Sequence, residues 1–369
     1  MKPAPISSVM RFARAREPLV VMGGAGFIGT NLVQCLLDDG EDVVVFDNLS
    51  RPGVERNLDF LQRRYGRRLR TVLSDIRDTN AVEDTVRNAK AVFHLAAQVA
   101  VTSSLVDPIQ DFAINAQGTL TILDAIRRLS PETPLVFAST NKVYGALDDV
   151  GTAPFEERYL PVDPTLREFG IAEGRRLDFC TPYGCSKGAA DQYVLDYAHS
   201  FGLKTAVLRM SCIYGPHQCG TEDQGWVAHF LIRAMRGEPI TVYGDGMQVR
   251  DILHVSDAVA AYRAVLGAID RVSGQAFNLG GGPANAVSLR VVLNEISRLT
   301  GRPVECWRQG WRTGDQRYFV ADTRRLSEAV RWRAAVGWRD GVADLADWIS
   351  REVVAAGDGD ALHKRRVHA

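Results

Sequence analysis

The sequence predicts an α/β fold in which a doubly wound parallel sheet is followed by a smaller C-terminal α/β region. Short apolar segments alternate with helical patterns from Leu19 to Arg209, as expected for the strands and helices of such a sheet. A glycine-rich turn joins the first apolar segment to the first helical pattern. After Arg209 the alternation breaks down into loop-like segments, which predict the smaller region.

Composition excludes several classes of protein. Of the 369 residues 46% are hydrophobic and 24% charged, so a sizeable core and a soluble surface are both available. Lys+Arg and Asp+Glu balance at 44 each, which argues against a nucleic-acid partner. No apolar run reaches the roughly 18 residues of a membrane span. The six cysteines show no zinc spacing, so we expect no metal site and reduced thiols in the cytoplasm.

The first strand and helix carry a dinucleotide-binding pattern. Leu19–Met22 is a short apolar strand, and Gly23, Gly26 and Gly29 follow it before a helical pattern. Glycines here let the backbone approach a pyrophosphate, while the helix N-terminus offers N–H groups and a positive dipole. The Gly-x-x-Gly-x-x-Gly spacing differs slightly from the commonest fingerprint. The strand, turn and helix context nevertheless favours a Rossmann-type cofactor site over an ordinary tight connection.

An acidic residue ends the second predicted strand, residues 42–46. Asp47 lies 18 positions after Gly29, where a carboxylate can bind the adenosine ribose hydroxyls. Because a carboxylate would repel a 2′-phosphate, the sequence predicts NAD as cofactor and disfavours NADP.

Further strands bring polar and small residues to the same edge of the sheet. They are predicted at residues 70–73, 91–94, 135–138 and 205–209, with a return to the sheet at 276–279. Asp75 and Ile76 follow the third strand, where adenine would lie. Ligands bind over the carboxyl ends of such strands, so we expect Ser139 and Thr140 to project there beside Tyr183.

Helices and irregular segments complete the pattern. Residues 146–180 contain three prolines and read as a long loop, and residues 1–17 and 356–369 read as flexible tails. Helices are predicted at residues 112–129, 186–201, 227–236 and 287–299.

Tyr183 and Lys187 lie four positions apart at the start of a helical pattern, which would put both side chains on one face. An ammonium beside a phenol favours the phenolate and lowers the pKa of the tyrosine. Such a tyrosine can take the proton of an alcohol that is being oxidised. The motif is loose by itself, and the rest of the chain gives it weight.

Together these motifs resemble the extended short-chain dehydrogenase/reductase family, specifically its NAD-dependent nucleotide-sugar epimerases and dehydratases. The resemblance spans residues 19–348 and is specific because many motifs occur in the right order. They are Gly23/Gly26/Gly29, Asp47-Asn-Leu-Ser, Asp75-Ile-Arg-Asp, His94-Leu-Ala-Ala, Asn115, Ser139-Thr140, Tyr183/Lys187, Arg209, Tyr214-Gly-Pro216, Arg250-Asp251 and His254-Val-x-x-Asp257.

The resemblance implies roles for individual residues. Tyr183 is the catalytic base, Lys187 anchors the nicotinamide ribose and lowers the pKa of the tyrosine, and Thr140 bonds the reacting hydroxyl. The implied cofactor-binding residues are Gly23, Gly26, Phe27, Ile28, Gly29, Asp47, Asn48, Ser50, Arg51, Asp75, Ile76, Leu95, Ala96, Ala97, Asn115, Ser139, Tyr183 and Lys187. The implied substrate-binding residues are Thr140, Asn141, Lys142, Ser211, Gln224, Arg250, Arg312 and Asp315.

Within the family, residues 139–145, 183–193 and 223–227 resemble 2-epimerases of CDP-linked deoxyhexoses. The 4,6-dehydratases carry an Asp-Glu pair after the catalytic threonine, and Asn141 and Lys142 stand there instead. UDP-sugar 4-epimerases usually have asparagine at the position of Cys212. The expected reaction is therefore epimerisation through transient oxidation to a ketone and return of the hydride. A UDP- or GDP-sugar 4-epimerase and a non-catalytic NAD-binding regulatory protein remain the alternatives.

The resemblance also implies a domain organisation and an assembly. Residues 18–210 form the NAD-binding domain, with returns near 250–280, and residues 211–249 and 281–355 form the substrate-binding region. Helices 112–129 and 186–201 are the candidates for pairing subunits into a homodimer or homotetramer.

Overall fold

The computed structural model of the chain describes residues 17–312 and 314–366. Apart from Glu17, the predicted N-terminal tail lies outside the described residues.

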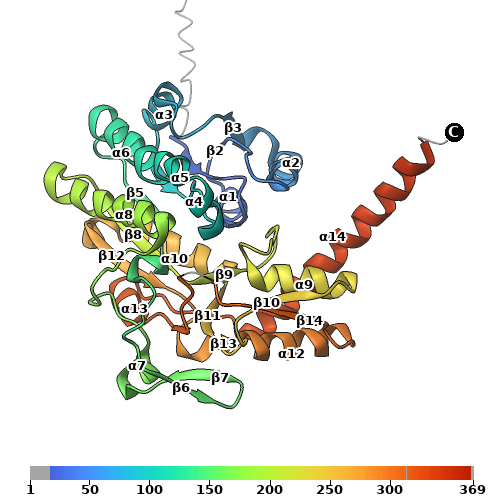
Figure 1. Cartoon of the computed structure of the whole chain (residues 1–369). Coiled ribbons are helices and arrows are strands. Elements are labelled where there is room, and N and C mark those ends of the chain that lie inside the picture. Colours follow the sequence, from blue (N-terminus) through green and yellow to red (C-terminus); the bar gives the residue numbers. More distant parts are fainter. Residues whose placement is uncertain (1–16, 313, 367–369) are drawn as a thin grey trace, which may run out of the picture.

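A seven-stranded parallel sheet forms the centre of the protein, in the order β12-β8-β5-β4-β1-β2-β3 (Figure 1). The chain winds outward from β1 to β3 and then returns to β4 on the other side of β1, which creates a topological switch point. Every strand predicted for this sheet is confirmed. The strands are β1 (Leu19–Met22), β2 (Val43–Asp47), β3 (Leu69–Leu73), β4 (Ala91–His94), β5 (Leu135–Thr140), β8 (Thr205–Met210) and β12 (Gln275–Leu279).

Helices cover both faces of this sheet, which explains why β1, β4 and β5 are buried along their whole length. On one face pack α1 (Phe27–Asp38), α2 (Val54–Tyr65), α10 (Val255–Gly267), α11 (Ile269–Val272) and α13 (Arg324–Val330). On the other face pack α3 (Thr79–Val86), α6 (Gly118–Leu129) and α8 (Thr181–Phe201).

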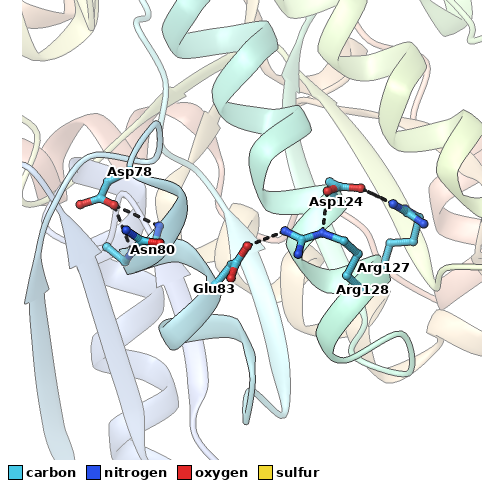
Figure 2. Close-up of polar contacts among 7 residues, drawn as sticks. Asp78, Asn80, Glu83, Asp124, Arg127 and Arg128 are labelled. Atoms are coloured by element: carbon cyan, nitrogen blue, oxygen red, sulfur yellow. Dashed lines mark hydrogen bonds and ion pairs between the residues drawn. The ribbon is translucent and has the colours of Figure 1, made fainter.

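Helices α3 and α6 are also joined by charged side chains at the surface (Figure 2). Arg128 of α6 pairs with Glu83 of α3 and with Asp124 of its own helix. Asp78 caps α3 by accepting hydrogen bonds from the backbone N–H groups of Asn80 and Ala81. Exposed ion pairs contribute little, about 0–1 kcal/mol each, so the buried apolar side chains between the helices hold this layer together.

The helix predicted at residues 112–129 has an interruption. It consists of α5 (Pro108–Phe112), a π-helical turn at Ala113–Gln117, and α6. A short helix, α4 (Val101–Val106), precedes it. Single π-helical turns inside α-helices frequently mark functional sites, and Asn115 lies within this one.

The C-terminal region has its own sheets, helices and apolar core (Figure 1). The return to the large sheet begins with α10, because the strand before it, β11, belongs to the small sheet. The strands are β9 (Cys212–Tyr214), β11 (Val249–His254), β13 (Ala286–Ser288) and β15 (Tyr318–Phe319), with the separate pair β10 (Ile240–Tyr243) and β14 (Cys306–Gln309). The helices are α9 (Trp226–Arg236), α12 (Leu289–Thr300) and α14 (Trp338–Arg366).

Residues 146–180 are not one long loop, and this prediction is wrong. They contain a hairpin, β6 (Thr152–Phe155) and β7 (Arg158–Pro161), and a short helix, α7 (Pro164–Phe169). Prolines are tolerated in such a two-stranded edge hairpin and at the first position of a helix. Asp163 caps α7 by accepting from the N–H groups of Thr165 and Leu166, so these prolines punctuate ordered elements.

Two other predictions need correction. The helix expected at residues 287–299 starts only at Leu289, because Ser288 ends strand β13 and caps α12 through the N–H of Val291. The expected C-terminal tail of residues 356–369 is helical as far as Arg366 within α14. No helix in the described part of the chain is both long and apolar enough to cross a membrane.

Candidate active site

The glycine turn between β1 and α1 is closely packed. Gly23 has φ +80, and a Cβ there would lie 2.7 Å from the backbone nitrogen of Ala96 at the exit of β4. A Cβ on Gly29 would lie 2.2 Å from the carbonyl oxygen of Gly23. Gly26 is the N-cap of α1 and has no side chain to bond the N–H groups of Phe27 and Ile28. This helix N-terminus is therefore suited to an anionic group such as a cofactor diphosphate.

Asp47 ends β2 beside this turn. Its carboxylate accepts hydrogen bonds from the backbone N–H groups of Ala25 (3.0 Å) and Leu49 (2.9 Å). Burial raises the pKa of Asp47, and these backbone hydrogen bonds oppose that effect. The carboxylate is thus fixed at the edge of the turn, as a ribose-binding acid requires.

The adenine side is formed by the residues after β2 and β3. Asn48 donates a hydrogen bond to Asp75 (2.9 Å), and the N–H of Ser50 donates to the Asn48 side chain. The hydrogen bond from Arg77 lowers the pKa of Asp75 to about 2. Ile76 is buried against α6, where only a glycine, Gly118, leaves it room.

The loop after β2 also contacts the loop after β9 in the C-terminal region. Burial lowers the pKa of Arg51, whose guanidinium lies near the thiol of Cys219 and the phenol of Tyr183. Asn57 donates hydrogen bonds both to the carbonyl of Ala25 in the glycine turn (3.2 Å) and to that of His217 (3.1 Å). The two regions therefore meet directly at the predicted cofactor site.

Asn115 organises the exit of β4, which carries Leu95, Ala96 and Ala97. Its side chain donates to the carbonyl of Gln98 and to Ser186, and it accepts from the N–H of Gln98. Ser186 in turn donates to the buried carboxylate of Asp111. Asp111 and Ser186 were not predicted from the sequence. Asp111 precedes the π-helical turn that contains Asn115, and Ser186 comes from α8.

Tyr183 and Thr140 are brought together, as predicted. Burial raises the pKa of Tyr183 to about 12, while a side-chain hydrogen bond from Thr140 and the charge of Arg51 act to lower it. The backbone N–H of Tyr183 donates to Ser104, and Thr181 has a left-handed φ of 66. Tyr183 is therefore held at the start of α8 with its phenol directed at Thr140.

Lys187 lies one turn further along α8. Its ammonium donates to the carbonyl of Ala138 (2.7 Å) and lies 4.1 Å from the ring centroid of Phe137. Burial lowers the pKa of Lys187 to about 7. In the protein alone, Thr140 and Arg51 are the groups that oppose the raised pKa of Tyr183. The roles of Lys187 on the nicotinamide ribose and on the pKa of Tyr183 stay predictions.

The expectation that Ser139 projects beside Tyr183 is also wrong. The Ser139 hydroxyl donates to Asp191 (2.7 Å), because successive side chains of a strand point to opposite faces. Asp191 forms a buried ion pair with Arg209 (2.8 Å). Arg209 also donates to the hydroxyl of Tyr144 (3.2 Å), so Ser139 belongs to a closed polar network beneath the site.

The predicted substrate side contains a cluster of charges. Burial lowers the pKa of Lys142 to about 8, and the neighbouring charge of Arg250 adds to this effect. Arg250 is buried and pairs with Asp315 at 2.6 Å. Two cations therefore face a single carboxylate, an arrangement that favours binding of an anionic ligand.

The remaining predicted substrate residues line the same side. Ser211 donates to the backbone carbonyl of Asp251 (3.0 Å). The guanidinium of Arg312 lies 3.8 Å from the ring centroid of Tyr243 and pairs with Glu222 and Asp223. Gln224 has a buried side-chain oxygen that no hydrogen-bond donor of the described residues reaches.

One further residue of the site was missed from the sequence. Gln316 is completely buried, accepts a hydrogen bond from Asn141 (3.0 Å) and donates to the carbonyl of Gly145 (2.6 Å). Its position in a loop with no regular period explains why pattern analysis could not find it.

Comparison with known proteins agrees with this geometry. Residues 19–280 match the NAD dependent epimerase/dehydratase family. The chain belongs to this family. It is an NAD-dependent enzyme, as the glycine turn and Asp47 predicted, and the packed glycines and uncapped start of α1 fit that cofactor.

The relatives match about nine-tenths of this chain. CDP-paratose 2-epimerase of Salmonella typhi is 41% identical over 346 residues, which cover 90% of this chain and 99% of the relative. The solved UDP-glucose 4-epimerase of Thermotoga maritima with UDP-glucose has a TM-score of 0.78 and 29% identity, covering 91% of this chain and 99% of its own. The Thermus thermophilus UDP-glucose 4-epimerase complex with NAD has a TM-score of 0.73 and 32% identity, covering 90% and 98%.

Proposed function

We propose that this enzyme epimerises a nucleotide-linked sugar, and that its substrate is a CDP-deoxyhexose inverted at C2, as in the conversion of CDP-paratose to CDP-tyvelose. The observation that carries the proposal is the Thr140–Tyr183 pair, followed at once by Asn141 and Lys142. An alcohol can be deprotonated there, but the two residues next to Thr140 supply no carboxylate for eliminating a neighbouring hydroxyl. The 41% identity with CDP-paratose 2-epimerase supports the choice of nucleotide and carbon.

The chain's own residues account for proton transfer and positioning. Thr140 and Tyr183 bond the reacting hydroxyl, and Tyr183 takes its proton and later returns it. NAD, when bound, would supply reversible hydride transfer at that carbon, and inversion would follow from return of the hydride to the opposite face of the ketone. Lys187 is proposed to hold the nicotinamide ribose, and its hydrogen bond to the carbonyl of Ala138 near the end of β5 supports this role.

The charge cluster suits a sugar diphosphate. Lys142 and Arg250 are both buried or nearly so, and Asp315 balances only one of them. A diphosphate in this place would satisfy both cations and raise the pKa of Lys142 toward its ordinary value. Gln224 and Ser211 lie on the same side and are proposed to contact the substrate.

The decisive experiment is a substrate panel. The purified protein is incubated with CDP-, UDP- and GDP-sugars, and the stereochemistry of each product is read by NMR. We expect inversion at C2 of a CDP-deoxyhexose, with the carbon-bound hydrogen retained in heavy water. Inversion at C4 of a UDP- or GDP-sugar would favour the second candidate, which the similarity to UDP-glucose 4-epimerases supports. Substantial solvent deuterium at the inverted carbon would contradict hydride return.

A catalytic role is preferred over a regulatory one. A protein that only binds NAD has no need of the complete Thr140, Tyr183 and Lys187 set.

The six cysteines are free, which suits the reducing cytoplasm in which nucleotide sugars are made and used.

The enzyme is also proposed to work as a homodimer or a homotetramer. Large apolar side chains are exposed on α4 and α5 and on α8, and pairing of these helices with a second copy would cover them. They are Leu105, Val106, Ile109, Phe112, Tyr193 and Phe201. Light scattering at micromolar concentration tests this assembly, and a monomer would contradict it.

A further inference from the structure

The turn that follows the catalytic threonine is fastened to a segment far away in the sequence, residues 314–316. Asn141 donates to the side-chain oxygen of Gln316 (3.0 Å), and Gln316 donates to the carbonyl of Gly145 (2.6 Å). Between these two points Lys142 donates to the carbonyl of Gly314 (3.0 Å). The backbone N–H of Lys142 meanwhile donates to the Thr140 hydroxyl (3.2 Å), so this turn directly contacts the proposed catalytic threonine.

The same segment touches the start of α8. Gly314 has φ +69, and a Cβ built there would lie 3.3 Å from Thr181 and 3.6 Å from the sulfur of Cys180. Thr181 has the unusual left-handed φ of 66 and precedes Tyr183 by two residues. A non-glycine residue keeps such a conformation only where its surroundings impose it. Residues 314–316 therefore contact both elements that place Thr140 opposite Tyr183.

The middle residue of the segment connects it to the charge cluster. Asp315 pairs with Arg250 at 2.6 Å, and Arg250 lies near Lys142. A diphosphate that binds the two cations would change the balance of charge around Asp315, at the centre of the segment. Residues 314–316 therefore contact both the charged groups proposed to bind the nucleotide and the elements that carry Thr140 and Tyr183.

We propose that Gln316 is a positioning residue, and that residues 314–316 couple binding of the nucleotide diphosphate to the placement of Thr140 and Tyr183. The coupling rests on the proposed function in one respect, because it takes the substrate to carry a diphosphate. In the proposed role Gln316 acts through Asn141 and Gly145, the residues that it bonds on either side of Lys142. Its burial supports a specific role, since an apolar side chain could fill the same space without the cost of desolvating an amide.

The first test separates positioning from packing. Gln316→Met keeps about the same volume but removes both hydrogen bonds. We expect kcat to fall about tenfold to a hundredfold, with little change in the affinity for CDP. The deuterium isotope effect on kcat, with substrate labelled at the inverted carbon, should rise because hydride transfer becomes slower. Gln62→Met, an exposed glutamine on α2, is the matched control and should leave all three quantities unchanged.

A second test asks whether Asn141 and Gln316 act as one unit. Asn141→Ala and Gln316→Ala should each lower kcat, and the double variant should be no slower than the slower single variant. Fully additive losses would show that the two side chains act independently and would overturn the proposal. A fall in kcat with no rise in the isotope effect would do the same.

The third test needs no turnover. Hydrogen exchange of the backbone amides of residues 140–145 is followed with and without CDP. Protection should increase in the wild type and not in Gln316→Met, although both bind CDP. Equal protection in both proteins would overturn the coupling. If the wild type converts a UDP- or GDP-sugar but no CDP-sugar, the proposed substrate is wrong, and UDP or GDP replaces CDP in the same measurement.

Discussion

Buried cations are balanced by carboxylates differently in the two halves of the candidate active site. Beneath the cofactor half, Arg209 is paired with Asp191 and further bonded to Tyr144, and both partners of the pair are almost inaccessible to solvent. On the substrate side, Lys142 and Arg250 lie close together with one carboxylate, Asp315, between them. The buried ion pair beneath the cofactor half is complete in the protein alone. On the substrate side the cations outnumber the carboxylate, as expected if the proposed substrate brings a negative charge.

The largest effect on stability is expected when the buried Arg209–Asp191 pair beneath the cofactor half is broken. Arg209→Met leaves the Asp191 carboxylate buried without its partner, which should lower the free energy of unfolding by about 3–5 kcal/mol. Urea denaturation measures the change. Arg312→Met, which removes a half-exposed cation from the substrate side, is the matched control and should change stability by less than about 1 kcal/mol. Equal losses in the two variants would show that the two halves do not differ.

Tyr183→Phe should leave the structure intact and abolish most of the activity. The ring keeps its packing, but the group that takes the proton is gone, so turnover should fall about a hundredfold or more. Folding and retention of NAD should survive, as judged by denaturation and by mass identification of the released nucleotide. Tyr193→Phe on the exposed face of the same helix is the control. Near-normal turnover by Tyr183→Phe would contradict general base catalysis.

The substrate half should respond to pH through Lys142. Its pKa of about 8 means that the cation is lost as the pH rises through that value, and with it part of the attraction for a diphosphate. Burial is the main cause of this lowered pKa, and the neighbouring groups that modify it are Arg250, Asp315, Cys212 and Cys180. KM should therefore rise above pH 8, by up to about tenfold per pH unit. In Lys142→Met this rise should be absent and KM should be high throughout, so a rise of the same size would assign the titration to another group.

The smallest effect on KM is expected from Arg312, at the edge of the predicted substrate side. Arg312 lies over the ring of Tyr243 and is already shared with Glu222 and Asp223. Arg312→Ala should raise KM only about two- to fivefold, as expected for one partly exposed cation already shared with two carboxylates, and should leave kcat unchanged. A large fall in kcat would instead show that Arg312 takes part in the reaction.

The cofactor half was predicted from the sequence better than the substrate half. Strands, glycine turn, Asp47 and the Thr140–Tyr183 pair follow from periodicity and motif spacing, because local backbone requirements fix them. The directions of Ser139 and Lys187 could not be predicted, since they depend on Asp191 and on the Ala138 carbonyl, which only the folded chain brings near. Gln316 was missed for the same reason: its partners lie 171 or more positions away.

The π-helical turn at Ala113–Gln117 amounts to one residue more than a regular helix would hold. Each residue rotates a helix by about 100°. The extra residue therefore lets α5 and α6 present different faces to α8 although they form one continuous helical segment. Asn115 gains its reach to Gln98 and Ser186 in this way, while α6 keeps its apolar side on the sheet. A single-residue deletion in this stretch would therefore be worse than any substitution. It would rotate either Asn115 out of the site or the apolar side of α6 into water.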